Sequence, residues 1–291
     1  MSENISINEP SVFFVGPERT GTTWIYQYLS TRNEVLLPKG TKETFFFDKY
    51  YSKGFNWYTS HFSHSDKELL AIEVAPTYFK SSVAMYRIKQ NVPNAKIVFT
   101  LRNPYDRSIS HINHLFRYGL IKNVNEAFLS EDCEAIFESL YSKAIANWIN
   151  TFGKENTSIL MFDDLVSSPA LFVKDLCDIV RIDYVPPSKY LRNTKINTFS
   201  VPSSILLAII GRRIGGFLRS HRFYWLLELS KKLGMKGLFF GKKNKKGFYP
   251  SEKTKIMLAN IFLDDLQKLE TTTSIDCTKW RIEMKRMIGE Y

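Results

Sequence analysis

Three short apolar segments of the chain predict strands: residues 11–16 (SVFFVG), 96–101 (KIVFTL) and 157–162 (TSILMF). Their apolar residues follow one another instead of alternating with polar ones, which is typical of parallel strands covered on both faces. A fourth strand is expected to end at residues 72–74. The pattern therefore predicts a buried, mostly parallel sheet.

Helical patterns follow these strands along the chain. Within residues 141–152, Ala144, Ile145 and Trp148 lie on one face of a helix. Pro104 and Pro169 stand in the first turn of two others, where the missing N–H costs nothing. The helices predicted are residues 22 to about 31, residues 104–118, residues 141–152, one capped by Ser168 or Ser167 that runs to about residue 180, and a last one opened by Ser251.

Strands that alternate with helices predict an α/β fold with three layers, α/β/α, around a mostly parallel sheet. No internal repeat, low-complexity tract or Pro/Gly linker divides the chain. We therefore expect a single domain over residues 1–291, in which residues 201–246 form a basic, apolar-rich helical cap or insertion.

Composition limits the class of protein. Hydrophobic residues make up 44% of the chain and aromatic residues 14%, as in globular proteins. The three cysteines are far apart and form no CxxC pair, which disfavours a disulfide framework and a zinc site and makes a reducing, cytoplasmic compartment the default. We see no secretory signal at the start of the chain and no apolar run long enough to span a membrane.

Positive charge is concentrated in one segment. Residues 201–246 contain eleven lysines and arginines and one acid, so this segment carries +10 of the net charge of +11. A pI near 9.4 by itself suggests a nucleic-acid-binding protein. That function requires a broad basic face or a known motif. Because the positive charge of this chain is instead confined to residues 201–246, we expect no nucleic-acid partner.

The turn after the first predicted strand has the features of a phosphate-binding loop. Residues 17–24 (PERTGTTW) lead from this strand into a helix. The small residues allow several backbone N–H groups to point at one spot, and the helix N-terminus adds a partial positive charge. Thr20, Thr22 and Thr23 offer hydroxyl donors, and Arg19 offers a full charge. The alternative is a strand-to-helix turn without a ligand.

An ordinary ATP or GTP site is disfavoured at this loop. Gly16 and Gly21 have the spacing of the G-x-x-x-x-G-K-[ST] loop of NTPases, but Thr22 stands where the lysine is required. The strand at residues 96–101 is followed by Arg102 and not by an aspartate that would hold Mg²⁺. A P-loop kinase of a small molecule therefore remains only as the alternative enzyme class.

A second anion-binding feature follows the strand at residues 96–101. Arg102 comes directly after this strand, and the carboxyl ends of strands are where open α/β sheets bind ligands. Ser110 lies two turns into the next helix. A cation and a hydroxyl in this arrangement suit a second phosphate, whereas the alternative is a surface cation beside a plain helix residue.

These segments together resemble the family of sulfotransferases that use PAPS (3′-phosphoadenosine-5′-phosphosulfate). Residues 17–24 look like the family's 5′-phosphosulfate loop, and residues 102–110 (RNPYDRSIS) look like its 3′-phosphate motif. Residues 42–48 (KETFFFD) are similar to the segment that carries the catalytic glutamate in heparan-type carbohydrate sulfotransferases. Residues 54–58 (GFNWY) and 73–79 (EVAPTYF) match the same branch.

The resemblance implies transfer of a sulfuryl group from PAPS to a hydroxyl of an acceptor, a carbohydrate or glycolipid, with adenosine 3′,5′-bisphosphate as product and no metal. It implies Glu43 as general base, with Arg19 and Lys42 as catalytic cations. For Trp24, a buried helix aromatic is as good an interpretation as an adenine contact. The implied donor-binding residues are Arg19, Thr20, Gly21, Thr22, Thr23, Trp24, Arg102, Ser110, Tyr141, Lys245, Lys246 and Gly247.

The chain departs from the family pattern at two positions. Arg19 stands where the loop often has lysine, so a planar fork replaces a point donor. Val74 follows Glu73, where the heparan-type branch usually has lysine, and Lys42 is the candidate substitute.

Two further features of the sequence are candidates for binding a metal ion or a membrane. The pairs His61/His64 and His111/His114 have i, i+3 spacing, but they lack a cysteine or acid at ligand spacing, so we predict no metal site. Residues 201–246 interleave apolar clusters with cations, which suits contact with a membrane interface. The alternative is a helical cap whose apolar face packs on the domain and whose cations line the cleft.

Overall fold

The computed structural model describes residues 6–7, 9–64, 69–117, 120–121, 123–129, 133–193, 205–226, 229 and 250–290. Lys245, Lys246 and Gly247 therefore lie outside the described residues. The chain divides into two units, Met1–Asn103 with Tyr141–Ile196 and Pro104–Leu140 with Asn197–Tyr291. We call them unit 1 and unit 2 and describe each by itself, and the single domain remains a prediction.

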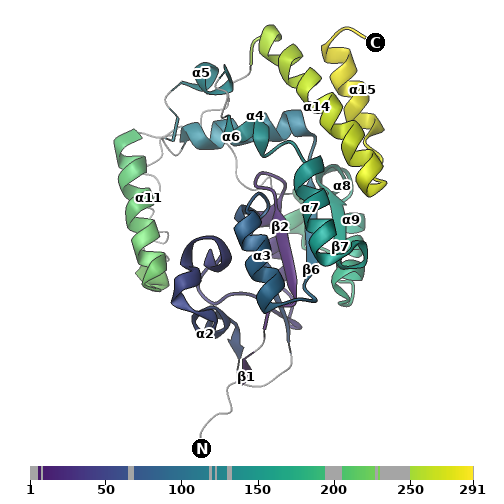
Figure 1. Cartoon of the computed structure of the whole chain (residues 1–291). Coiled ribbons are helices and arrows are strands. Elements are labelled where there is room, and N and C mark those ends of the chain that lie inside the picture. Colours follow the sequence, from purple (N-terminus) through teal and green to yellow (C-terminus); the bar gives the residue numbers. More distant parts are fainter. Residues whose placement is uncertain are drawn as a thin grey trace, which may run out of the picture. The chain divides into compact units, whose positions relative to one another are not determined.

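Unit 1 is built on a five-stranded parallel sheet with the strand order β3-β5-β2-β6-β7 (Figure 1). The sequence predicted the main strands from their apolar runs. All residues of β2 are buried, as are all of β6 except Lys96, whereas in β7 Leu160 is buried and the other residues are half-buried. The predicted third apolar strand ends at Met161, since Phe162 already begins α8. The strands are β2 (Val12–Gly16), β3 (Val35–Leu36), β5 (Leu70–Val74), β6 (Lys96–Leu101) and β7 (Thr157–Met161).

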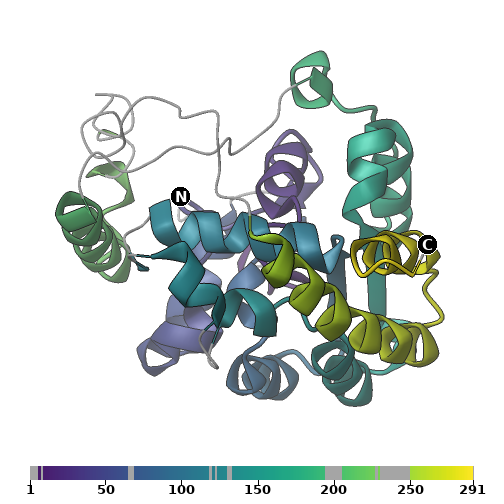
Figure 2. The same ribbon diagram turned by 90° about the horizontal axis from the view of Figure 1, so that it is seen from above.

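Helices cover both faces of this sheet, which confirms the three-layer α/β/α fold. One face carries α1 (Thr22–Leu29) and α9 (Pro169–Val180), whose apolar side chains share a core with Phe14 and Val98. On the other face lie α3 (Ser82–Asn91) and α7 (Ser142–Phe152), where Phe99 packs edge-on against Trp148. Figure 2 shows the two pairs of helices on opposite sides of the sheet.

Shorter elements complete unit 1. An aromatic segment between β3 and β5 contains a π-helix (Phe46–Tyr50), 3₁₀ turns (Tyr51–Lys53 and Ser60–Phe62) and α2 (Phe55–Thr59). The two-residue strands β1 (Ser6–Ile7) and β4 (Ser63–His64) pair antiparallel in a separate small sheet that the sequence did not predict. The remaining elements are 3₁₀ turns at Pro76–Tyr78 and Lys154–Asn156, α8 (Phe162–Ser167) and α10 (Lys189–Asn193).

The described part of unit 2 is helical. Ser251 caps α14 (Glu252–Thr273) as predicted, because its side chain accepts a hydrogen bond from the N–H of Thr254. This helix is not the last, since α15 (Thr278–Met287) follows. The other helices are α4 (Pro104–Arg117), α5 (Val124–Leu129), α6 (Glu134–Phe137) and α11 (Ile205–Ser220). None of the helices in the described ranges is both long and apolar enough to cross a membrane.

Predicted helix starts were accurate where proline or a capping serine marked them. Pro104 and Pro169 begin α4 and α9. The predicted cap at Ser168 is wrong in its chemistry, because Ser168 makes no side-chain capping bond and the start rests on Pro169 alone.

Candidate active site

The strand order of the parallel sheet reverses at β2, because β3 and β5 lie on one side of it and the later strands β6 and β7 lie on the other. The strand β2 pairs with β5 on one side and with β6 on the other. In open α/β sheets, chain connections leave such a strand and its neighbour on opposite faces, and ligands bind at the crevice formed there. Three segments therefore reach this edge of unit 1: the loop after β2, the residues after β6 and the end of β5.

The loop after β2 has a defined conformation that leads directly into α1. Thr20 is fully buried, and its Oγ1 donates to the carbonyl of Pro17 at 2.7 Å. Arg19 has a left-handed backbone with a φ of 72°, which is uncommon outside glycine. Gly21 has a φ of 89°, and a Cβ there would lie 2.8 Å from Leu165 Cδ2. Only glycine fits this position, which directly precedes the N-terminus of α1.

The predicted loop hydroxyls have different roles. The Thr20 hydroxyl is used inside the loop and shapes it. Thr22 and Thr23 occupy the first two positions of α1, next to the helix N-terminus. The structure therefore puts Thr22 and Thr23, rather than the side chain of Thr20, where an anion would meet hydroxyl donors.

Trp24 lies in the core of unit 1. Its ring stacks on Tyr28 and meets Phe172 of α9 edge-on, and its Nε1–H donates to the carbonyl of Leu191 at 2.9 Å. Only 6% of the residue is exposed. Its donor and both neighbours are therefore used in packing, which favours the buried-aromatic interpretation over the adenine contact.

Arg102 stands at the same edge of the sheet, directly after β6. Its carbonyl accepts a hydrogen bond from the hydroxyl of Tyr141 at 2.7 Å, and Tyr141 is fully buried. Its guanidinium carbon lies 5.0 Å from the ring centroid of Phe162. Both of these contacts lie within unit 1, which also carries the loop. Ser110 lies on α4 in unit 2.

Lys42 and Glu43 form an ion pair in the segment before the π-helix. Nζ of Lys42 lies 2.6 Å from Oε1 of Glu43, and their side chains are 21% and 16% exposed. Phe45, two residues on, has a left-handed backbone with a φ of 54°. For a bulky residue this conformation costs energy and requires the surroundings to hold it. The predicted base and its cation therefore lie together on a segment with a constrained backbone.

A second carboxylate, Glu73, is fully buried near the end of β5. Its Oε1 accepts hydrogen bonds from the N–H and the hydroxyl of Thr44, at 2.9 and 2.6 Å. Its Oε2 accepts from the hydroxyl of Tyr58 at 2.9 Å, and the hydroxyl of Tyr78 lies 3.3 Å from Oε1. Burial raises the pKa of Glu73 from 4.5 to about 7, although the bonds from Thr44 and Tyr58 act in the opposite direction.

From the sequence, Glu73 is part of a matching motif and, with the histidines, an alternative candidate for the base, but its burial and its donors are not predicted. Its position inside an apolar strand was the one available signal, because a carboxylate in a buried strand requires donors around it.

Comparison with known proteins places the chain in a family. A family model described as "Sulfotransferase domain" matches residues 9–201, about two thirds of the chain. The chain belongs to the sulfotransferase domain family. This confirms the resemblance drawn from residues 17–24 and 102–110, and the matched range contains the whole sheet of unit 1.

Curated relatives of this sulfotransferase chain include heparan sulfate enzymes. The bifunctional heparan sulfate N-deacetylase/N-sulfotransferase 1 of Caenorhabditis briggsae is 25% identical over 63% of this chain and 24% of its own length. The heparan sulfate glucosamine 3-O-sulfotransferase 3B1 of Mus musculus is 24% identical over 64% of this chain and 50% of its own. The chain thus spans a quarter to a half of these relatives.

A solved structure has the same fold. The crystal structure of a sulfotransferase from Alicyclobacillus acidocaldarius matches with a TM-score of 0.66 at 19% identity, over 94% of this chain and all of that one. At this identity the match concerns the fold, which agrees with the three-layer architecture of unit 1.

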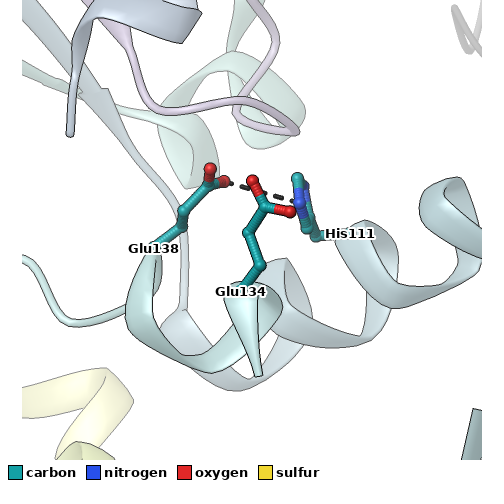
Figure 3. A group of neighbouring side chains, drawn as sticks. All are labelled: His111, Glu134 and Glu138. Carbon is teal, nitrogen blue, oxygen red and sulfur yellow. Dashed lines mark ion pairs between the residues drawn. The ribbon is translucent and has the colours of Figure 1, made fainter. Parts of the chain in front are cut away.

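One cluster in unit 2 of this sulfotransferase chain has the outline of a metal site. The cluster consists of His111 on α4, Glu134 on α6 and Glu138 directly after α6. Their potential ligand atoms lie within 4.8 Å of one another (Figure 3). Glu138 is already ion-paired with the fully buried Arg107, which also donates to the Ser139 hydroxyl at 3.0 Å. A cation would have to bind beside this guanidinium, so the donor set does not fit a metal ion and serves to join α4 to α6.

Proposed function

We propose that the chain is an enzyme that transfers a sulfuryl group from PAPS to a hydroxyl of an acceptor. The observation that supports the proposal is that the loop of residues 17–23 and Arg102 directly follow adjacent parallel strands of unit 1, the unit that also contains the Lys42–Glu43 ion pair. Two separate anion-binding features suit a nucleotide with phosphates at both its 5′ and 3′ positions, and the family match supports this donor.

The residues take the following roles in this proposal. Gly21, Thr22 and Thr23 bind the 5′-phosphate through N–H groups and hydroxyls, because a helix N-terminus attracts anions. Arg19 neutralises charge on the sulfonate and the bridging oxygen. Arg102 binds the 3′-phosphate. Tyr141 contributes to this site by donating a hydrogen bond to the carbonyl of Arg102, which positions that residue. Ser110, Lys245, Lys246 and Gly247 join the 3′-phosphate site on the strength of the sequence.

The chemical step requires a base and charge stabilisation. Glu43 accepts the proton of the acceptor hydroxyl while the oxygen of that hydroxyl forms a bond to sulfur. The bond from sulfur to the phosphate oxygen breaks, and adenosine 3′,5′-bisphosphate leaves. Lys42, paired with Glu43, supplies positive charge at the reacting centre in place of the lysine that Val74 replaces. Arginine, lysine and N–H groups carry the developing charge, so the proposed step calls for no metal ion.

The acceptor we propose is a carbohydrate or a glycolipid. The curated relatives act on heparan sulfate according to their names, and the residues around Glu43 resemble the segment that carries the catalytic glutamate in heparan-type enzymes. Incubation of the protein with labelled PAPS and separate pools of glycans and glycolipids tests this class, with transfer of label as the expected result. Transfer to neither pool would contradict it.

A retention experiment separates the enzyme classes. The protein is bound to immobilised adenosine 3′,5′-bisphosphate with EDTA present, and elution by the free bisphosphate but not by ATP is expected. Elution by ATP with Mg²⁺ would favour the kinase alternative, and retention on duplex DNA that survives the bisphosphate would favour the nucleic-acid alternative.

We also propose peripheral contact with an anionic membrane surface, at the cytoplasmic face, through residues 201–246. Apolar side chains of this segment are exposed: Ile214 at 53%, Phe217 at 58% and Trp225 at 63%. Arg213 and Arg222 beside them are exposed as well. An exposed apolar face with flanking cations suits a lipid interface. The cap alternative instead requires the apolar face to be covered by the domain.

A further inference from the structure

Glu73 has a hydrogen-bonding environment made up of donors. The N–H and hydroxyl of Thr44 reach one carboxylate oxygen, and the hydroxyl of Tyr58 reaches the other. Burial keeps the Tyr58 and Tyr78 hydroxyls protonated, since it raises the pKa of both well above the ordinary value. An ionised carboxylate accepts hydrogen bonds only, so this environment matches the ionised form of Glu73.

The partners of Glu73 come from segments that are far apart in the sequence. Thr44 directly follows Glu43, Tyr58 lies on α2, and Tyr78 lies in the turn after β5. The strand β5 is paired with β2 and β3, so Glu73 is anchored in an interior strand of the sheet. Through Thr44, this anchor fixes the backbone at the residue next to Glu43.

We infer that Glu73, Thr44 and Tyr58 form a clamp that positions Glu43 for proton abstraction. The inference rests on the proposed sulfuryl transfer with Glu43 as base. Two hydrogen bonds to one residue restrict both the position of the Thr44 backbone and its side-chain rotamer. The backbone of the adjacent Glu43 is restricted with them, while Phe45 on the other side is held in its left-handed conformation. Glu73 is therefore a positioning residue, and Glu43 is the residue that meets the acceptor.

The hydrogen bonds of the clamp depend on the protonation state of Glu73. The pKa of about 7 means that Glu73 is ionised, with all of its accepted bonds intact, above neutral pH. The titratable groups that face it are Glu43, whose charge raises the pKa of Glu73, and the hydroxyls of Tyr58 and Tyr78. The kcat is therefore expected to fall at acidic pH as Glu73 becomes protonated and the clamp loses accepted hydrogen bonds.

Variants at Thr44 test the clamp without removing the buried charge. Thr44→Val keeps the shape and the backbone N–H but loses the hydroxyl, whereas Thr44→Ser keeps both donors. A hydrogen bond to a charged group is worth roughly 1.5–3 kcal/mol, so Thr44→Val should lower kcat by roughly ten- to a hundredfold. KM for PAPS and the Kd for adenosine 3′,5′-bisphosphate should stay unchanged, and Thr44→Ser should retain nearly full kcat.

A double-mutant cycle decides whether the clamp acts through Glu43. In a Glu43→Gln background, Thr44→Val should have no further effect on kcat, because the group that it positions is gone. An equal loss in both backgrounds, or wild-type kcat in Thr44→Val, would overturn the inference. The acceptor used is a heparan sulfate oligosaccharide.

Hydrogen exchange tests the clamp independently of activity. The Thr44 amide should exchange slowly in the wild type and in Glu73→Gln, which keeps an acceptor oxygen, and at least tenfold faster in Glu73→Leu, which has none. Equal exchange in all three would refute the clamp even in an active enzyme. A wild type that binds no bisphosphate and transfers no label, yet shows the expected exchange pattern, would refute the proposed function and limit the clamp to a structural role.

Discussion

At the scale of single residues, Arg102 makes the most direct prediction about the donor. Arg102→Ala removes a charged partner of the proposed 3′-phosphate, a loss of roughly 1.5–3 kcal/mol. Affinity for adenosine 3′,5′-bisphosphate should therefore fall by roughly ten- to a hundredfold. Calorimetry with EDTA present measures this. Arg192→Ala, at an exposed arginine on α10 in the same unit, is the matched control and should bind normally. Unchanged affinity in Arg102→Ala would remove the assignment.

A variant of Glu43 distinguishes an effect on catalysis from an effect on donor binding. Glu43→Gln cannot accept the acceptor proton, so transfer should fall by about 10²–10⁴-fold, the usual range for loss of a general base. Donor affinity should persist, because neither phosphate is held by Glu43. Rates of labelled product formation and calorimetry on the same sample report the two quantities, with the exposed Glu155→Gln as control. Normal transfer by Glu43→Gln would exclude it as the base, and Glu73 would be the next candidate.

At the scale of elements, a charge-reversal variant in α11 and the turn after it tests the proposed membrane contact. Replacement of Arg213, Arg219 and Arg222 by glutamate reverses charge beside the exposed apolar side chains. Binding to vesicles that contain anionic lipid should be strong at low salt in the wild type, weaker at high salt, and absent in this variant. Vesicle flotation measures it.

A matched variant with the same change of charge elsewhere controls for net charge. Lys143, Lys154 and Lys174 are exposed cations of unit 1, and their replacement by glutamate should leave flotation unchanged. No flotation of the wild type at low salt, or equal loss in both variants, would contradict contact through α11 and favour the cap.

Elements with a strong local signal were predictable and those held by distant contacts were not. The strands β2, β6 and β7 contain apolar runs, and Pro104, Pro169 and Ser251 mark helix starts, so their places follow from adjacent residues. The pairs β1–β4 and β3–β5 involve two-residue strands, which are too short to show a period. The candidate phosphate loop and Arg102 could be proposed from the sequence because each directly follows its own strand. The Glu73 clamp was not, because its partners meet only in the folded sheet.

At the scale of the whole molecule, Glu73 couples function to stability. Its pKa is 4.5 in an unfolded chain and about 7 in the fold, so between these values the folded state binds more protons than the unfolded state. The free energy of unfolding should therefore fall as pH rises from about 4.5 to 7 and stay low above that. A shift of this size corresponds to about 3 kcal/mol, since each unit of pKa is worth about 1.4 kcal/mol.

Glu73→Gln removes this titration and should be more stable than the wild type at pH 8 by about 1–3 kcal/mol, with the difference shrinking towards pH 5. Urea unfolding at the two pH values measures it, and Glu9→Gln, at an exposed position, should show no such pH-dependent gain. A constant difference across pH would mean that Glu73 does not titrate in this range. The clamp needs the ionised form of Glu73, whereas folding favours its protonated form. Activity should therefore increase over the pH range in which stability decreases. The same carboxylate lowers stability at the pH at which it best positions Glu43.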